Sequence, residues 1–423
     1  MLALLLLPSA LDHQWGSLLR AALAGLALFA FYLALIGGVY GVFLSVDAFL
    51  FFVFYEIAII PKYFLIAIWG STRKEYGAMK LALYSFIGSA LVLIGLIAVF
   101  VVARAQTGVA TFDLLALGKL AYPETFQRWV FPLVFVGFAI LAGLWPFHTW
   151  APTGHVAAPT AASMLLAGVV MKLGAYGCLR VAMTLFPEGF VEWRFFFAVL
   201  AVIGIVYGAL VALVQKDFKF VIGYSSVSHM GFVILGLATL NIVGLQGAVL
   251  QMFSHGVIAG LLFAVVGRMV YDRTHTRQFA DLEGFGLSKV MPFAAVTFVL
   301  AGMASMGLPG FSGFVAELQV LMGAWKAFPT LTVISGVGVV IGVAYTMRAV
   351  QKGFFADAPA AASTHGHDHD HPLPPISVPE RLATVLLLGV SLLIGLYPSL
   401  LLNWIRPAFE SPMFDRLLRG GLL

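Results

Sequence analysis

The residues best suited to chemistry in this sequence are ionisable side chains that lie inside long apolar runs. We single out six of them, namely Glu56, Lys62, Lys172, His229, His255 and Glu317. Burial disfavours the charged form of a carboxylate or an amine, whereas a neighbouring opposite charge favours it, so the proton affinity of such groups is tunable. Histidines between them can pass protons near neutral pH. Together these residue types suggest a proton relay.

Each of these residues also has a structural interpretation. His229 and His255 are also consistent with neutral, hydrogen-bonded packing residues. Lys62 is able to extend its amine toward the helix end marked by Trp69, about 10 Å away. The structural interpretation is weakest for Glu56, Lys172 and Glu317, because a buried unpaired charge is strongly unfavourable. A charge at the centre of a membrane helix costs about 2.5 to 3.5 kcal/mol on insertion scales, so each needs a partner or water.

The composition identifies the surroundings of these charges as a lipid bilayer. Hydrophobic residues make up 61% of the 423 positions, charged residues 10%, and the mean hydropathy is +1.00. No soluble domain of this size can bury so much apolar surface. The net charge of +5 fits loop lysines and arginines that set membrane topology, so no nucleic-acid partner is expected.

The sequence carries no sign of a redox centre of its own. The single cysteine, Cys178, excludes a disulfide within the chain and a cysteine-ligated iron–sulfur cluster or zinc site. No dinucleotide-binding fingerprint and no phosphate-binding loop are present. We therefore expect no cofactor in this chain, and any electron chemistry belongs to partner proteins.

The elements that position the charges are transmembrane helices, and the predicted fold class is an all-α polytopic membrane protein. Apolar runs near the length that spans a bilayer predict about eleven helices. They are expected near 21–44, 47–69, 77–103, 129–147, 159–184, 195–214, 219–239, 245–271, 292–323, 329–354 and 381–405. Lysines and arginines gather on one side of this arrangement, which predicts that side to be cytoplasmic and the C-terminus to lie outside.

Two of the runs are expected to be broken in mid-membrane. Prolines interrupt "FAILAGLWPFHTWAPTGHVAAPT", and glycines and a proline interrupt "ASMGLPGFSGFVAEL". Unwound backbone is tolerated at membrane depth only where protein buries it or it lines a watery cavity. Each break falls in the fourth helix of five, a pattern typical of inverted-repeat transporters. The predicted organisation is an N-terminal segment (1–20), two five-helix repeats (21–184 and 195–354), a polar loop (355–380) and a C-terminal helix with a tail (381–423).

Two segments outside the helices have specific expectations. The apolar stretch within residues 1–20 is short and no basic residue precedes it, so it is a poor signal peptide. The cytoplasmic loop 355–380 is rich in histidine and proline, and its histidines alternate with glycine and aspartate at His365, His367, His369 and His371. Such a pattern can bind a divalent metal. A flexible loop is the favoured interpretation, because alternating residues in such a loop form no preorganised site, and we predict no metal site.

Five stretches of the sequence resemble the antiporter-like subunits of respiratory complex I, the NADH-quinone oxidoreductase. They are "FFVFYEIAIIPKYFLIAIWG", "WPFHTWAPTGHVAAPTAASMLLAGVVMKLGAYGCLR", "QKDFKFVIGYSSVSHMGFV", "SHGVIAGLLFAVVGRMVYDRTHTR" and "GLPGFSGFVAEL". The resemblance extends from about residue 21 to the end of the chain. It implies an integral protein of the bacterial inner membrane that couples electron transfer in partner subunits to proton translocation. It also implies antiporter-like neighbours on both sides in the membrane arm, and NADH, FMN, iron–sulfur clusters and quinone in other subunits.

The resemblance also implies roles for the six residues. Glu56 matches the glutamate of the family's fifth helix and Lys172 the lysine of its eighth helix. His229 and His255 match the connecting relay, and Glu317 matches the terminal acid on the broken twelfth helix.

The sequence departs from the family pattern in two respects. The family usually has fourteen helices, so about three are expected to be missing at the N-terminus, through a genuine variation or a wrongly assigned start codon. The family's seventh-helix lysine, which pairs with the fifth-helix glutamate, is replaced here by Leu141. Lys62 is an additional lysine, and we hypothesise that its amine serves instead, helped by a kink at Pro61.

Two further interpretations stay open at this point. The chain is also compatible with a subunit of a multisubunit cation/proton antiporter or of a membrane-bound hydrogenase, because these share the motifs. The loss of the seventh-helix lysine is also compatible with an inactive structural spacer in the membrane arm. The sequence does not distinguish H⁺ from Na⁺ as the transported ion.

Overall fold

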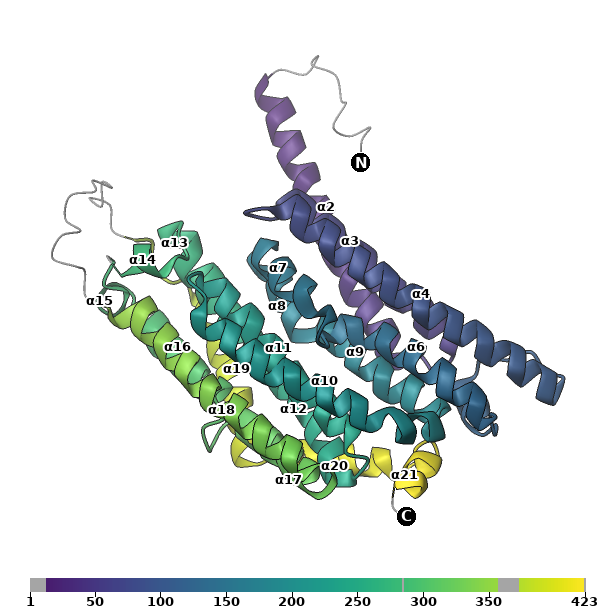
Figure 1. Cartoon of the computed structure of the whole chain (residues 1–423). Coiled ribbons are helices and arrows are strands. Elements are labelled where there is room, and N and C mark those ends of the chain that lie inside the picture. The colour runs from purple at the N-terminus through teal and green to yellow at the C-terminus, as the bar shows by residue number, and fades with distance from the viewer. Residues whose placement is uncertain (1–12, 284, 357–372, 422–423) are drawn as a thin grey trace.

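A computed structural model describes residues 13–283, 285–356 and 373–421. In this part of the chain the regular elements are helices, and ten of them are long and apolar enough to cross a membrane. The long helices run side by side through the molecule (Figure 1), and the first helix starts at the end of the bundle opposite to the last one. The predicted all-α polytopic membrane fold is therefore confirmed.

Several of the membrane-length spans consist of more than one helical segment, as in Glu124–Ala157 and Thr160–Met183. The first half of the chain forms α2 (His13–Leu44), α3 (Ala48–Trp69), α4 (Lys74–Thr107), α5 (Leu114–Gly118), α6 (Glu124–Ala142), the 3₁₀ turn η1 (Phe147–Thr149), α7 (Trp150–Ala157), α8 (Thr160–Leu165), the π-helix η2 (Leu166–Val170), α9 (Met171–Gly177) and the π-helix η3 (Cys178–Met183). The second half forms α10 (Pro187–Val214), α11 (Phe218–Ala238), α12 (Ile242–Phe263), the π-helix η4 (Ala264–Tyr271), α13 (Asp272–Thr274), α14 (Phe279–Leu282), α15 (Leu287–Val290), α16 (Pro292–Ser305), α17 (Ser312–Ala327), α18 (Pro329–Val350), the π-helix η5 (Gln351–Phe355), α19 (Val378–Leu396), α20 (Ser399–Phe409) and α21 (Asp415–Gly421).

Helix α2 begins inside the segment that was expected to precede the first repeat. It starts at His13, so residues 13–20 are helical, and residues 1–12 lie outside the described part of the chain. Its first half projects beyond the other helices (Figure 1), and it packs against α3 further along. Large apolar side chains on α2 stay exposed, among them Leu26, Phe29 and Leu33. Such a face is suited to lipid or to a neighbouring membrane helix.

The first predicted break is confirmed, but the helix around it is longer than the apolar run 129–147. Helix α6 begins at Glu124 and ends at Ala142, where Gly143 takes a φ of 84°. Only glycine adopts this left-handed conformation without strain, so the helix stops there. The chain resumes as η1 and α7, which ends before Pro159.

The second predicted break is confirmed as well. Helix α16 ends at Ser305 and α17 begins at Ser312, so the expected run 292–323 is two shorter helices. Between them, Gly307 and Gly310 take φ angles of 74° and 102°. Both breaks thus follow from local glycine and proline chemistry.

The expected last helix, 381–405, was wrong as a single element. Helix α19 ends at Leu396, and α20 begins at Ser399 in a new direction. Pro398 has no N–H to donate to the helix ladder, and the ring disfavours helical backbone at the preceding residue. Tyr397 accordingly has φ −131° and ψ 69°. Helices α20 and α21 then run across the end of the bundle that carries the C-terminus (Figure 1).

Corresponding helices in the two predicted repeats begin in the same way. Asp47 caps α3 and forms an isolated β-bridge with Asp113, which follows the third helix of the first half. Asp217 caps α11 and forms the same kind of bridge with Gln278, which follows the third helix of the second half. Equivalent helices of the two halves, such as α3 and α11, are five crossings apart along the chain, so they are expected to run in opposite directions. The division into inverted repeats stays a prediction, and these features are consistent with it.

Candidate functional site

Lys172 and His255 are in direct contact inside the bundle. The Lys172 Nζ atom lies 2.6 Å from His255 Nδ1 and donates to the Ala167 carbonyl oxygen at 2.5 Å. Ala167 belongs to the π-helix η2, just before Lys172 on α9. A π-turn interrupts the regular helix ladder, which makes a carbonyl available to a side chain. Lys172 is buried with 4% of its surface exposed, so this contact is shielded from bulk solvent.

A pair of glycines brings the two helices that carry these residues together. A Cβ atom added to Gly256 on α12 would lie 2.6 Å from the Gly168 carbonyl oxygen on η2. This approach is too close for any larger residue without movement of the backbone. The absence of both side chains therefore permits the helix contact that places Lys172 against His255.

Glu317 and His229 form a second buried pair. His229 Nδ1 lies 2.9 Å from Glu317 Oε1, and Gln251 Nε2 donates to the same oxygen at 3.2 Å. The other ring nitrogen, His229 Nε2, lies 3.2 Å from the Ser305 hydroxyl. These residues come from α11, α12, α16 and α17, so the α16–α17 break lies beside the acid.

The two pairs are joined through the histidine rings. The centroids of His229 and His255 lie 5.4 Å apart. A cavity of about 10 Å³ lies beside them, lined by His229, His255, Ser254, Ser305 and Glu317. A water molecule needs roughly 10–15 Å³, so this space is close to the size of one water. Lys172, His255, His229 and Glu317, which the sequence singles out separately, thus form one continuous buried series.

The other two predicted residues lie apart from this series. Lys62 on α3 has 1% of its surface exposed, and its Nζ has no hydrogen-bond partner among the described residues. Glu56 lies on the same helix, half-buried, and its Oε1 atom also has no such partner. No ion pair within 4.0 Å joins the two in the described part of the chain, although they interact electrostatically at longer range.

Three residues around Glu56 and Lys62 bear on how these two charges are stabilised. The Ser89 hydroxyl on α4 faces the Glu56 carboxylate while it donates to the Ser85 carbonyl oxygen. Leu141 is fully buried in the apolar core of α6. Pro61 lies inside a continuous α3, so any kink leaves the helix intact. The hypothesis that the Lys62 amine replaces the family's lysine stays a prediction.

Two buried basic residues, Lys219 and His155, were not predicted as site residues from the sequence. Lys219, on the first turn of α11, has 1% of its surface exposed, and its Nζ donates to the Ala158 carbonyl oxygen at 3.3 Å. His155 on α7 is fully buried, with both ring nitrogens unpaired among the described residues. His155 is close enough to both Lys172 and Lys219 to interact with each of them electrostatically. The available signal was the position of Lys219 directly inside an apolar helix, rather than in the preceding loop.

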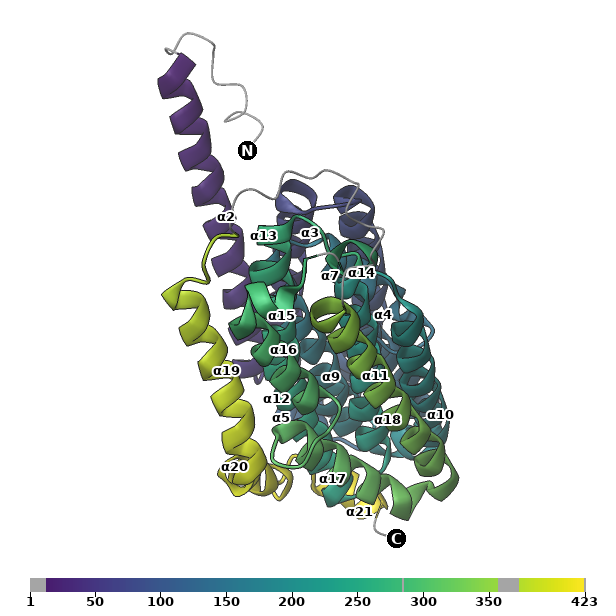
Figure 2. The ribbon, with the colours of Figure 1, turned by 90° about the vertical axis from the view of Figure 1, so that its left-hand side faces the viewer.

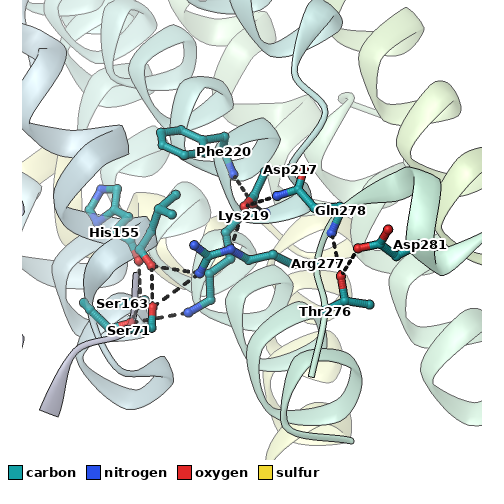
Figure 3. A network of polar contacts seen from close by, with 12 residues as sticks. Ser71, His155, Ser163, Asp217, Lys219, Phe220, Thr276, Arg277, Gln278 and Asp281 are labelled. Carbon is teal, nitrogen blue, oxygen red and sulfur yellow. Dashed lines mark hydrogen bonds and ion pairs between the residues drawn. The ribbon is translucent and has the colours of Figure 1, made fainter. Parts of the chain in front are cut away.

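A buried ion pair fixes the start of α11 against α7 (Figure 3). Arg277 Nε donates to Asp217 Oδ2 at 2.6 Å, and Arg277 Nη1 donates to the Val156 carbonyl oxygen at 3.1 Å. Asp217 Oδ1 accepts the Lys219 backbone N–H at 2.8 Å, which caps α11. A cavity of about 780 Å³ lies at this position, with Asp217, Arg277 and Gln278 in its wall. The network places Lys219 just behind a polar opening.

No metal site is found in the described part of the chain. Groups of three or more histidine, cysteine, aspartate or glutamate side chains positioned to hold a metal are absent from these residues. The four histidines of the loop, His365, His367, His369 and His371, lie outside the described residues. Whether that loop binds a metal stays open, and the prediction that it does not is untested.

Comparison with known proteins identifies relatives of this architecture. Residues 45–342 match the family described as NADH:quinone oxidoreductase/Mrp antiporter, transmembrane. The chain is 38% identical over 376 residues to the NADH-quinone oxidoreductase subunit M of Rhodobacter capsulatus, covering 87% of this chain and 71% of that protein. It is 39% identical over 310 residues to the subunit M of Rickettsia prowazekii, covering 73% of this chain and 61% of that protein. The chain thus spans between three fifths and three quarters of these relatives' lengths.

Solved structures agree with this assignment. A chain of respiratory complex I from Thermus thermophilus superposes with a TM-score of 0.83 at 30% identity, covering 92% of this chain and 79% of that one. A chain of the Mrp complex from Dietzia sp. has a TM-score of 0.78 at 23% identity, covering 93% of this chain and 79% of that one, and shows a shared fold. On this evidence, the chain belongs to the family of antiporter-like membrane subunits that includes subunit M of NADH-quinone oxidoreductase.

Proposed function

We propose that this chain carries protons across a bacterial inner membrane as a subunit of the membrane arm of NADH-quinone oxidoreductase. Electron transfer takes place in partner subunits, which hold NADH, FMN, iron–sulfur clusters and quinone. The chain contributes the proton path, with antiporter-like subunits on either side. The names of the relatives in Rhodobacter and Rickettsia and the Thermus complex support this assignment.

The observation that carries the proposal is the continuous buried series from Lys172 to Glu317. A buried ammonium next to a neutral imidazole can donate its proton directly, because Lys172 Nζ and His255 Nδ1 are within hydrogen-bond distance. From His255 the proton passes to His229, either across the rings or through one water. His229 then delivers it to Glu317 along the 2.9 Å contact.

Lys219 and His155 supply the proton to Lys172 in this scheme. The polar cavity in front of Asp217 and Arg277 brings water to the start of α11. Lys219 lies behind this cavity, and His155 interacts electrostatically with both Lys219 and Lys172. In this scheme the three basic groups form the path from the membrane surface to its centre. The side carrying this cavity is the cytoplasmic side according to the distribution of lysine and arginine.

Glu56 and Lys62 control the series from the neighbouring helix α3. Their charges interact at a distance, and neither is held by a direct hydrogen-bond partner at the buried atoms. A proton arriving on Glu56 removes its negative charge, which lowers the affinity of nearby bases for their protons. In this scheme the first repeat (21–184) contains the controlling pair on α3, and the second repeat (195–354) contains the terminal acid, Glu317.

A specific observation keeps the spacer alternative in view. Leu141 occupies the position of the family's seventh-helix lysine, and Glu56 lacks a direct cationic partner among the described residues. Substituting Glu56→Gln separates the two functions. A proton-carrying subunit loses pumping with this change, whereas a spacer assembles and leaves pumping unchanged. The Mrp-like fold keeps a cation/proton antiporter as the other alternative, and the co-purifying subunits distinguish it.

The proposal is tested by purifying the complex that contains this chain and identifying its subunits. In vesicles, the protons moved per NADH oxidised are then compared between the unaltered chain and Glu317→Gln. The matched control is Glu410→Gln, because Glu410 is exposed and pairs with Arg406 away from the series. We expect Glu317→Gln to lower the ratio and the control to keep it. Co-purification without NADH-oxidising subunits, or an unchanged ratio in Glu317→Gln, would overturn the proposal.

A further inference from the structure

A half-open groove lies on the outside of the bundle next to Lys172. Its volume is about 740 Å³, within the range of roughly 300–1,000 Å³ that encloses small-molecule ligands. Its walls come from α9 and η3 on one side, from α12 on the other, and from α20 at one end. The side chains along it are almost all apolar, for example Leu179, Val249 and Phe253. Lys172 and Arg180 are the charged residues in its wall.

The guanidinium of Arg180 has no matching anion among the residues that the structure describes. Its Nε atom is buried and has no hydrogen-bond partner within the described segments, and its Nη1 atom lies against the Met413 thioether. A thioether is a weak acceptor. No carboxylate in the described part of the chain forms an ion pair with Arg180. A buried unsatisfied donor on a charged group is costly, so the site calls for an anionic acceptor that the described residues do not supply.

The position of Arg180 matches the depth of lipid phosphates. Helix α20 lies across the end of the bundle (Figure 2) and carries Trp404, whose side chain is 80% exposed at the groove. Exposed tryptophans gather at the membrane–water interface, where headgroups lie. Residues 172 and 180 are eight positions apart, about 12 Å along a helix. One leaflet of hydrocarbon is roughly 15 Å deep, so an acyl chain that starts near Arg180 reaches Lys172.

We propose that this groove binds one anionic phospholipid, with the phosphate paired to Arg180 and an acyl chain laid over Lys172. Guanidinium and phosphate groups form paired charge-assisted hydrogen bonds, which satisfy the Nε donor. The acyl chain fills the apolar wall and excludes water from the bilayer side of Lys172. This last consequence rests on the proposed relay, whereas the binding of the lipid does not.

Photo-crosslinking in the intact reconstituted complex tests the site. The probe is phosphatidylglycerol with a diazirine on one acyl chain, compared with phosphatidylcholine that carries the same chain. Adducts are mapped by peptide mass spectrometry to residues 168–180 and 249–257. We expect phosphatidylglycerol to label these segments more than phosphatidylcholine does, and Arg180→Gln to lower that labelling by about tenfold, the loss expected for a charge-assisted contact.

Two further variants keep the test decisive. Arg128→Gln is the matched control, because Arg128 is exposed on α6 and pairs with Glu192 outside the groove, and its labelling should equal that of the unaltered chain. Val249→Trp fills the groove without changing charge, and it should lower the labelling by both lipids. Equal labelling by the two lipids would overturn the proposal, and so would unchanged labelling in Arg180→Gln and Val249→Trp. Lipid adducts on a neighbouring subunit in place of the groove segments would also overturn it. None of these readouts requires pumping, so they are independent of the proposed function.

Discussion

The buried charges differ in how completely their neighbours satisfy them. Lys172 has a carbonyl and an imidazole within 2.6 Å, whereas Lys62 is equally buried and has no hydrogen-bond partner at Nζ among the described residues. A structural lysine in such a place is expected to be selected against, because burial of an unpaired ammonium destabilises the fold. We therefore interpret Lys62 as a functional residue whose charge interacts with that of Glu56 at longer range.

This interpretation predicts opposite effects of Lys62→Met on stability and pumping. Methionine fits the apolar surroundings, so the thermal stability of the complex should stay equal or rise. Proton transfer should slow by ~10²-fold, the contribution typical of a positioned acid or base. Lys326→Met, at an exposed position near the end of α17, is the matched control. If Lys62→Met pumps at the unaltered rate, Lys62 is a bystander.

The sequence alone was sufficient to nominate the four residues of the buried series, because ionisable groups in apolar runs are rare and expensive. It was not sufficient to show their connections, which join α9, α11, α12 and α17 across long sequence separations. Lys219 and His155 were missed for a related reason. A lysine near a helix start is usually solvated, whereas the Nζ atom of this one donates to the Ala158 carbonyl oxygen, which directly follows α7, and α7 packs against α11.

At the scale of helices, glycine and proline made the breaks predictable. Gly143, Gly307 and Gly310 adopt positive φ angles at the two interruptions. The same reasoning applied to Pro398 would have separated α19 from α20, but a continuous apolar run obscured it. The π-helices η2 and η4 contain no glycine or proline pattern comparable to that of the breaks, so the sequence did not predict them.

Helix packing predicts a clear difference between two glycines of α12. A Cβ on Gly256 would meet the Gly168 carbonyl oxygen, whereas nothing lies within 4 Å of the corresponding position on Gly260. We expect Gly256→Ala to destabilise the protein by about 1–3 kcal/mol, as overpacking typically does, and to lower pumping by moving His255 away from Lys172. Gly260→Ala should leave pumping unchanged and gain up to about 1 kcal/mol, because alanine favours helix. Thermal unfolding and proton transport measure both effects, and equal behaviour of the two variants would contradict the proposed contact.

Over the whole molecule, the distribution of charge and the alternating helices predict one orientation. The polar cavity at Asp217 and the loop containing α15 are predicted to lie on the cytoplasmic side, and α20 and α21 on the other side. The fold class could be predicted from the composition. The relation between the two halves rests on the matching helix starts at Asp47 and Asp217, and the β-bridges at these two residues are visible only in the structure.

Accessibility of introduced cysteines checks this orientation. Lys289→Cys and Glu410→Cys place thiols at exposed positions on opposite sides, and the native Cys178 is fully buried and should stay unreactive. In intact cells with a permeabilised outer membrane, an impermeant maleimide should label Glu410→Cys at once. Lys289→Cys should react only after the inner membrane is opened. The reverse pattern would show that the chain is inserted the other way.

The most direct test of the buried series is the number of protons moved per NADH oxidised by the reconstituted complex with Lys172→Met. Methionine keeps the volume of the side chain and removes the amine that lies 2.6 Å from His255. The account predicts an assembled complex in which the ratio falls well below that of the unaltered complex, while Lys326→Met keeps it. An assembled Lys172→Met complex with an unchanged ratio would contradict the claim that protons pass through Lys172.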